Sequence, residues 1–187
     1  MEKINQTKRK WLSLGGLILG GSLFPHSTFA TVLNMPQSRL LKLKNINTGE
    51  KLISKYINGK SFSAEDMKKI NYLMRDRRTN LVHTMDPKLF AKFYDIQNKL
   101  GLRNCELSII CGYRSPKTNA QLHSKSNQVA VNSYHIKGQA IDFRIDCISL
   151  AKVRDAAKSL KNGGVGYYPK SNFIHIDTGP VRNWRGT

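Results

Sequence analysis

The chain is short of acidic residues, with 12 Asp and Glu against 31 Lys and Arg, which gives a formal net charge of +19. Such a chain is attracted to polyanions, namely nucleic acid, an anionic membrane or an acidic cell-wall polymer. We find no repeat at a fixed period, and a hydrophobic fraction of 40% argues against a disordered or fibrous chain. The length of 187 residues suits one domain behind a short targeting segment.

A long hydrophobic run is also missing. The apolar stretch at 11–24 is too short for a stable membrane span, which takes roughly 20 residues. It follows basic residues at 8–10 and precedes a cleavage-site pattern that ends at Ala30, which is the order of an export signal. The basic stretch resembles a twin-arginine signal in which Lys8 replaces the first Arg. We therefore expect an export signal at 1–30 and no stable membrane anchor after its cleavage; the alternative is an uncleaved anchor. A lipoprotein anchor is not expected, because no Cys directly follows the run.

Cysteines are few, and their spacing does not match a zinc ribbon, so we do not expect them to bind metal. An exported protein can oxidise one pair of the three cysteines, Cys105, Cys111 and Cys147, and leave one thiol free. Cys105 precedes a predicted strand at 107–111, and Cys147 follows one at 139–145. If these strands are antiparallel neighbours, a Cys105–Cys147 disulfide is possible, provided that the two Cα atoms come within about 7 Å.

The elements that are present predict an α+β fold in 31–187, with helices first and then a small, mostly antiparallel sheet. A hairpin is expected at the start, because apolar and basic residues alternate before and after a turn at Asn47 and Gly49. Ser63 is a predicted helix cap, and apolar residues recur at helical spacing in two segments that follow. The expected helices are 63–77, 86–100, 115–122 and 150–160, and the expected strands are 39–45, 51–57, 107–111, 139–145, 165–168 and 173–177.

One constellation of residues is able to carry chemistry. His135 and Asp142 flank Gly138, which can take a positive φ and let the chain turn sharply between them. His175 and Asp177 are two residues apart on a predicted strand, so both point to one face. Two imidazoles and a carboxylate with one open position form the layout of a catalytic zinc site, where the metal acidifies its water and polarises a carbonyl.

Four motifs resemble those of the D-Ala-D-Ala carboxypeptidase and VanX-like group of zinc peptidases, and within it the YcbK/MepK-type murein endopeptidases. The resemblance runs from about residue 39 to 184 and implies a hedgehog/D-Ala-D-Ala peptidase-like fold whose sheet carries the zinc site. The motifs are Gly112-Tyr113-Arg114-Ser115, Ser133-x-His135-x-x-Gly138-x-Ala140-x-Asp142, Gly164-Val165-Gly166-Tyr167-Tyr168-Pro169 and Phe173-Ile-His-Ile-Asp177-Thr178-Gly179.

Carried over by these motifs, His135, Asp142 and His175 are the zinc ligands. Arg114 is expected beside the metal, where a guanidinium can stabilise the oxyanion or bind a substrate carboxylate; its alternative is an ordinary salt-bridged surface position. One departure concerns Asn172, which stands where many relatives of the group have an acidic general base. Asp177 is the nearest carboxylate, and we expect it to act in catalysis as the general base; the alternatives are a group that orients a zinc histidine and a turn residue.

The sequence thus predicts a zinc-dependent murein endopeptidase of the periplasm that opens peptidoglycan peptide crosslinks during wall growth or remodelling. A carboxypeptidase that trims stem peptides and an inactive peptidoglycan-binding module are the alternatives. A nucleic-acid partner is not expected, because the export signal removes the chain from nucleic acid and no groove-reading motif is present. Which crosslink bond is cut, D,D or L,D, and the oligomeric state stay open at this point.

Overall fold

A seven-stranded sheet organises the part of the chain that the structure, a computed structural model, describes: residues 39–187 apart from 57–61, 104 and 127–128. The predicted export signal lies outside these residues. The strand order is β2-β1-β3-β4-β6-β5-β7. The strands are β1 (Arg39–Asn45), β2 (Lys51–Tyr56), β3 (Leu107–Cys111), β4 (Ala140–Ile145), β5 (Gly164–Tyr168), β6 (Phe173–Asp177) and β7 (Arg182–Arg185).

Most strand pairings in this sheet are antiparallel, as expected; β1 with β3 and β5 with β7 are parallel. The expected order of helices first and sheet second is wrong, because the N-terminal hairpin belongs to the same sheet. Leu43 of β1 lies opposite Leu107 of β3, and both are buried in the core. Strand β7 was not predicted: its residues lack apolar alternation, and it is held by pairing with β5.

Four helices are present among the described residues: α2 (Ala64–Leu73), α3 (Lys88–Lys99), α4 (Pro116–His123) and α5 (Leu150–Ser159). Ser63 caps α2 as predicted, since its hydroxyl accepts a hydrogen bond from the Asp66 amide at 3.0 Å. The helix ends at Leu73 and not near 77, and the Met74 carbonyl just beyond it accepts a hydrogen bond from the Tyr113 amide. None of the helices in this described part is both long and apolar enough to cross a membrane.

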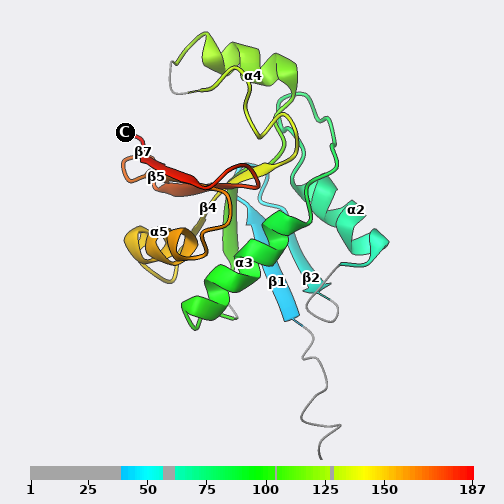
Figure 1. Cartoon of the computed structure of the whole chain (residues 1–187). Coiled ribbons are helices and arrows are strands. Elements are labelled where there is room, and N and C mark those ends of the chain that lie inside the picture. Colours follow the sequence, from blue (N-terminus) through cyan, green and yellow to red (C-terminus); the bar gives the residue numbers. More distant parts are fainter. Residues whose placement is uncertain (1–38, 57–61, 104, 127–128) are drawn as a thin grey trace, which may run out of the picture. The chain divides into compact units, whose positions relative to one another are not determined.

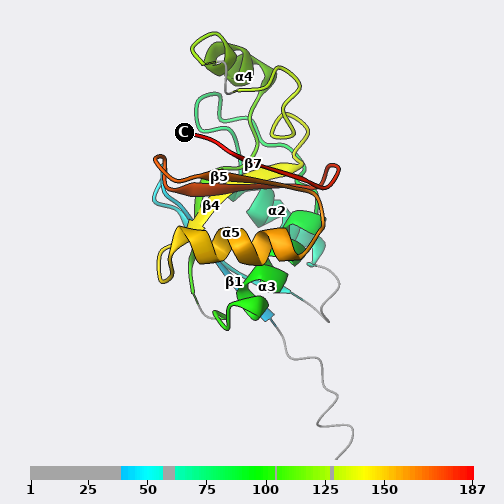
Figure 2. The same cartoon turned by 60° about the vertical axis from the view of Figure 1, so that its left-hand side comes forward.

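The core lies between the sheet and the helices α3 and α5. Phe93 of α3 packs against Phe143 of β4 with ring centroids 4.7 Å apart, and Ile174 and Ile176 of β6 are buried in the same cluster. Because side chains alternate along a strand, Asp142 and His175 point to the opposite face. Both views of the protein place α3 and α5 on one side of the sheet and α4 on the other (Figures 1 and 2).

The β3–β4 strand pair has the confirmed disulfide at one of its ends. Strands β3 and β4 are antiparallel neighbours, and Cys105 and Cys147 at their shared end are bonded, with Cα atoms 6.7 Å apart. Cys111 is a free thiol. The described residues from 39 onward belong to one compact unit.

Candidate metal centre

A single row of residues crosses the sheet at the site. Cys111 of β3 pairs with Asp142 of β4, Asp142 with His175 of β6, His175 with Gly166 of β5, and Gly166 with Trp184 of β7. Directly opposed residues on neighbouring strands share a face of the sheet. Strand pairing alone therefore brings Asp142 and His175, which are 33 residues apart in sequence, side by side.

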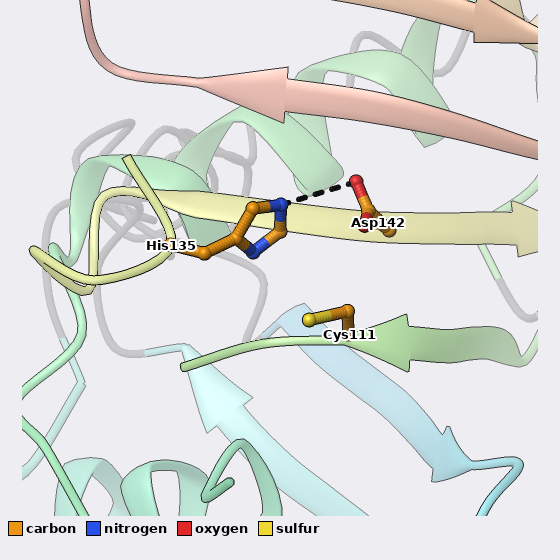
Figure 3. A group of neighbouring side chains, drawn as sticks. All are labelled: Cys111, His135 and Asp142. Atoms are coloured by element: carbon orange, nitrogen blue, oxygen red, sulfur yellow. Dashed lines mark ion pairs between the residues drawn. The ribbon is translucent and has the colours of Figure 1, made fainter. Parts of the chain in front are cut away.

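His135 reaches this row from the connection between α4 and β4. The chain turns back at Gly138, whose φ of 66° any side chain would disfavour. A Cβ at Gly138 would also lie 2.3 Å from the Thr84 carbonyl oxygen. This close approach fixes the turn, and the imidazole of His135 extends over β4 toward Asp142 (Figure 3).

Three side-chain atoms converge in a small triangle. His135 Nε2 lies 3.3 Å from Asp142 Oδ1, His175 Nδ1 lies 2.9 Å from the same oxygen, and the two nitrogens are 3.2 Å apart. Ligand atoms at roughly 2.0–2.1 Å from a tetrahedral zinc ion are about 3.3 Å apart. The triangle therefore has the size and the chemical composition of three ligands to one small divalent cation.

The other ring nitrogens of both histidines are occupied. His135 Nδ1 lies 2.7 Å from the Gly112 carbonyl oxygen, to which it can only donate, and His175 Nε2 lies 3.1 Å from Asp177 Oδ2. Such hydrogen bonds fix the tautomer and the orientation of a ligand imidazole. When the rings are neutral, these hydrogen bonds leave His135 Nε2 and His175 Nδ1 as acceptors, and these are the two nitrogens of the triangle.

The centre favours positive charge beside Asp142. Burial alone lowers the pKa of His135, but Asp142 and Cys111 outweigh burial and raise that pKa to about 10. Burial likewise raises the pKa of Asp142, yet the adjacent His135 and His175 hold it well below its usual value. A buried carboxylate that stays ionised requires a cation next to it, and a divalent metal is able to supply that charge.

Asp177 lies outside the triangle, on the Nε2 side of the His175 ring. Its Oδ1 accepts hydrogen bonds from the amides of Gly164 and Gly179 at 2.9 Å each, and Arg182 Nη2 donates to its Oδ2 at 2.6 Å. The side chain is fully buried. Burial raises the pKa of this carboxyl, but the bonds from His175, Arg182 and the amides hold it well below its usual value. Every oxygen of Asp177 is thus engaged in holding neighbouring groups.

Arg114 lies on the other side of Asp142, with its Nη2 3.9 Å from Asp142 Oδ2. The same nitrogen lies 3.5 Å from the Cys111 sulfur, and Nη1 is 3.3 Å from the Asn119 side-chain oxygen. Its Nε is buried without a hydrogen-bond partner. The guanidinium therefore lies next to the triangle of His135, Asp142 and His175 atoms and has an N–H group that is not hydrogen-bonded.

A groove of about 410 Å³ opens onto the three candidate ligands. Aromatic side chains line its walls together with the two guanidinium groups, and Asp142 is the only carboxylate among the described residues that line it. Asn172 is exposed on the β5–β6 turn with a φ of 54°, and it does not line the groove. The wall residues are Arg114, Tyr134, Tyr168, Phe173, Arg182 and Trp184.

Cys111 was not expected at the site. Its sulfur and ligand atoms of His135 and Asp142 all lie within 4.8 Å of one another (Figure 3). The sequence signal for it was its position directly before Gly112-Tyr113-Arg114 at the end of a strand, which is where β3 delivers its last side chain. The spacing of the three cysteines pointed away from metal binding.

A buried triangle of two histidines and an aspartate on a small sheet, with an arginine beside it, has the donor types and the spacing that a metallopeptidase centre needs. The family model described as peptidoglycan L,D-endopeptidase MepK matches residues 34–184. The chain therefore belongs to this family of M15 peptidases. The resemblance seen in its motifs is confirmed, and so is its assignment to the murein endopeptidases.

Curated relatives cover essentially the whole chain. The chain is 60% identical over 186 residues to the probable peptidoglycan L,D-endopeptidase MepK of Haemophilus influenzae, which covers 100% of both chains. It is 46% identical over 184 residues to the peptidoglycan L,D-endopeptidase MepK of Escherichia coli K12, which covers 98% of this chain and 100% of the relative. The Shigella flexneri protein of the same name matches equally well. No solved structure matches.

Proposed function

We propose that the chain is an exported, zinc-dependent peptidoglycan L,D-endopeptidase that hydrolyses peptide crosslinks during growth or remodelling of the wall. The observation that carries the proposal is the triangle of His135 Nε2, Asp142 Oδ1 and His175 Nδ1, with sides of 2.9–3.3 Å, at the floor of a groove. The L,D specificity is taken from the names of the relatives in Haemophilus influenzae and Escherichia coli.

The residues of the triangle suit zinc in donor type and number. Two imidazole nitrogens and one carboxylate oxygen make a three-ligand set that keeps one coordination position open, as catalytic zinc sites do. When bound, the zinc ion supplies Lewis acidity for the scissile carbonyl and for the attacking water. A complete ligand set with oriented imidazoles supports an active enzyme over an inactive binding module.

Arg114 and Arg182 give the groove its recognition chemistry. Both guanidinium groups line it, and a planar guanidinium binds a carboxylate through two parallel hydrogen bonds. Peptidoglycan stem peptides carry carboxylates, so these side chains are suited to hold them. Arg114, beside Asp142, is in addition the donor that can stabilise negative charge as it develops on the carbonyl oxygen under attack.

We assign Asp177 the orienting role in place of the general-base role that the sequence led us to expect. Its Oδ2 accepts from His175 Nε2, and its remaining bonds run to Arg182 and to backbone amides. A carboxylate behind a ligand imidazole fixes the ring and raises its basicity. A general base has to lie within hydrogen-bond reach of the attacking water, and Asp177 faces the opposite nitrogen of the ring.

The proposed location is the periplasm, with residues 1–30 as a cleaved export signal and 31–187 as the peptidase domain. Support comes from the basic and apolar order of the N-terminal residues. Sequencing the N-terminus of the periplasmic protein checks cleavage after Ala30. Export in cells that lack the twin-arginine translocase checks the route.

Digestion of purified sacculi tests the activity. The mature protein should release muropeptides cut at L,D bonds of crosslinks, and removal of zinc by a chelator should stop the release until zinc is restored. The His135→Ala variant is the negative control. Release of products cut only at the C-terminus of uncrosslinked stems would favour the carboxypeptidase alternative, and binding to sacculi without cleavage would favour the inactive module.

A further inference from the structure

The free thiol of Cys111 lies at the metal centre although the spacing of the cysteines does not indicate metal binding. Cys105 and Cys147 are joined in a disulfide at the far end of β3 and β4, so Cys111 is the free cysteine. It occupies the end of β3 directly opposite Asp142. The oxidised pair and the reduced cysteine thus sit at opposite ends of the same two strands.

A register shift in β3 directs this side chain to the site. Ile109 pairs with Phe143, whose ring packs on α3, and regular antiparallel pairing would next place Cys111 opposite Ile141. The register shifts between Ile109 and Cys111, so Cys111 pairs with Asp142 instead. An extra residue in one strand turns the following side chain to the other face. Cys111 therefore shares the face that carries the ligands.

The thiol completes a second set of possible ligands that overlaps the first. The Cys111 sulfur lies within 4.8 Å of a ligand atom of His135 and of Asp142, and these two residues also belong to the triangle with His175. Figure 3 shows the three side chains converging from β3, β4 and the connection before β4. Arg114 Nη2, 3.5 Å from the sulfur, stabilises the thiolate form that a metal requires.

We propose that Cys111 is an exchangeable fourth protein ligand of the metal held by His135, Asp142 and His175, an inference that rests on the proposed metal function. The thiol releases its proton to solvent, and the thiolate sulfur donates an electron pair to the metal. Four protein ligands make a closed site, whereas hydrolysis requires one position open to water. The thiolate has to leave that position before turnover, so it defines a resting form of the centre.

Solvent has its own route to the thiol. A second hollow of about 310 Å³ is lined by Cys111, Arg114 and Asp142, whereas Cys111 does not line the groove above the triangle. Cys111 is partly exposed. A small alkylating reagent therefore has a path to Cys111 that does not pass through the groove, and its rate of reaction reports whether the thiol is coordinated.

Cobalt substitution tests the proposal without reference to activity. The mature protein, purified with its disulfide intact, is titrated with Co²⁺ and followed in the near ultraviolet, where thiolate-to-cobalt charge transfer absorbs. We expect this band at one equivalent in the wild type and its loss in Cys111→Ser, which should still bind one equivalent. A wild-type protein that binds one equivalent without the band overturns the proposal and leaves the proposed function intact. A wild-type protein that binds no cobalt or zinc overturns both.

Removing a ligand sharpens the test. Without His175, the residues Cys111, His135 and Asp142 still offer three donors, so His175→Ala should retain measurable zinc affinity. The double variant His175→Ala/Cys111→Ser should bind zinc at least about tenfold more weakly than His175→Ala. Zinc should also slow the alkylation of Cys111 by iodoacetamide in the wild type. Equal zinc affinities for the single and double variants, or alkylation unaffected by zinc, contradict the proposal.

Discussion

The two ends of the β3–β4 strand pair differ in how their facing side chains interact. At one end, Cys105 and Cys147 form a covalent bond that needs no further partner. At the other end, Cys111 and Asp142 are directly opposed, beside His135 and Arg114. Cys111 is a reduced thiol and Asp142 is an ionised carboxylate. The first end is joined by a covalent bond within the chain. The second end presents side-chain atoms that can bind a cation.

This difference separates rigidity from function along one pair of strands. A disulfide stabilises the fold by lowering the conformational entropy of the unfolded chain, and it offers no free thiol for binding or reaction. A cluster of buried polar groups costs stability unless each group is paired, and here the pairing is completed by hydrogen bonds to groups behind the cluster, such as Gly112 and Asp177. The active end is therefore supported from outside the strand pair, and the predictions below act on one end or the other.

The largest effect is expected at the metal end. His135→Ala removes a corner shared by both possible ligand sets, so zinc binding and sacculus hydrolysis should both be abolished. Zinc content by mass spectrometry and muropeptide release measure the two effects. The matched control is His123→Ala, because His123 is exposed on α4 and its Nδ1 contacts the Val129 carbonyl. If His135→Ala kept one zinc and full activity, the assigned site would be wrong.

Opening the disulfide end should change stability and spare the metal. The Cys105–Cys147 bond spans a sequence separation of 42 residues, and chain entropy assigns a loop of this size about 4 kcal/mol. Cys105→Ser/Cys147→Ser should therefore lower the unfolding free energy by up to about this amount, measured by denaturation with chelator present. Zinc stoichiometry at low temperature should remain one. A loss of zinc binding in the folded double variant would mean that the two ends are not independent.

Asp76 supports the metal end from a distance and should make it sensitive to acid. Asp76 Oδ2 accepts hydrogen bonds from the Ser115 amide at 2.9 Å and the Ser115 hydroxyl at 2.6 Å, next to Arg114. Burial raises the pKa of this carboxyl, but the hydrogen bonds from Ser115 and Thr118 hold it well below its usual value. The ionised Asp76 carboxylate therefore stabilises the fold fully at a pH above the pKa that this carboxyl has in the unfolded chain. The stabilisation is lost as the pH falls through the pKa of the same carboxyl in the folded protein.

Asp76→Asn should reduce the unfolding free energy by about 2–3 kcal/mol at neutral pH and flatten its decline in acid. Denaturation curves from pH 7 to about pH 3 measure both effects. Asp155→Asn is the control, because Asp155 is exposed and pairs with its neighbour Arg154. An unchanged acid profile in Asp76→Asn would show that the carboxylate does not stabilise this turn.

Asp177 separates the holding of zinc from the transfer of a proton. In the orienting role, Asp177→Asn should weaken zinc binding by roughly 10- to 100-fold, with activity restored by excess zinc. As a general base, its loss should lower turnover by about 100-fold or more at saturating zinc. As a turn residue, it should affect only the melting temperature. Zinc affinity, turnover and melting temperature measured on the one variant decide among the three, and we expect the first outcome.

The candidate ligands His135, Asp142 and His175 came from the motifs of the family resemblance and were supported by local patterns, whereas the other features of the site depended on pairing between distant segments. Gly138 between His135 and Asp142, and the alternation of His175 with Ile174 and Ile176, are patterns within a few residues. The nitrogen of His175 that faces Asp177 depends on the packing of its ring, which spacing does not encode, so the sequence could not separate the base role that it favoured from the two alternatives.

The same limit explains what was missed. Strand β7 has no apolar alternation and depends on parallel pairing with β5. The parallel contact of β1 with β3 joins segments more than sixty residues apart, and it made one sheet of what was expected as a separate hairpin. Cys111 reaches the metal centre only because the register of β3 shifts after Ile109. In contrast, the disulfide followed from one assumption, that β3 and β4 are antiparallel.

The smallest expected effect concerns Arg114, whose Nη2 lies near both Asp142 and the Cys111 sulfur. Arg114→Lys keeps the positive charge but loses the planar fork, so one ammonium nitrogen has to replace the two nitrogens that lie near Asp142 and Asn119. We expect hydrolysis to fall by about tenfold or more, equivalent to about 1.4 kcal/mol, with little change in melting temperature or zinc content. The matched control is Arg144→Lys, because Arg144 is paired with Asp146 in an exposed hydrogen bond and does not line the groove. Normal turnover in Arg114→Lys would reduce Arg114 to a charge that balances Asp142. A parallel loss of zinc would instead assign it to the stability of the centre.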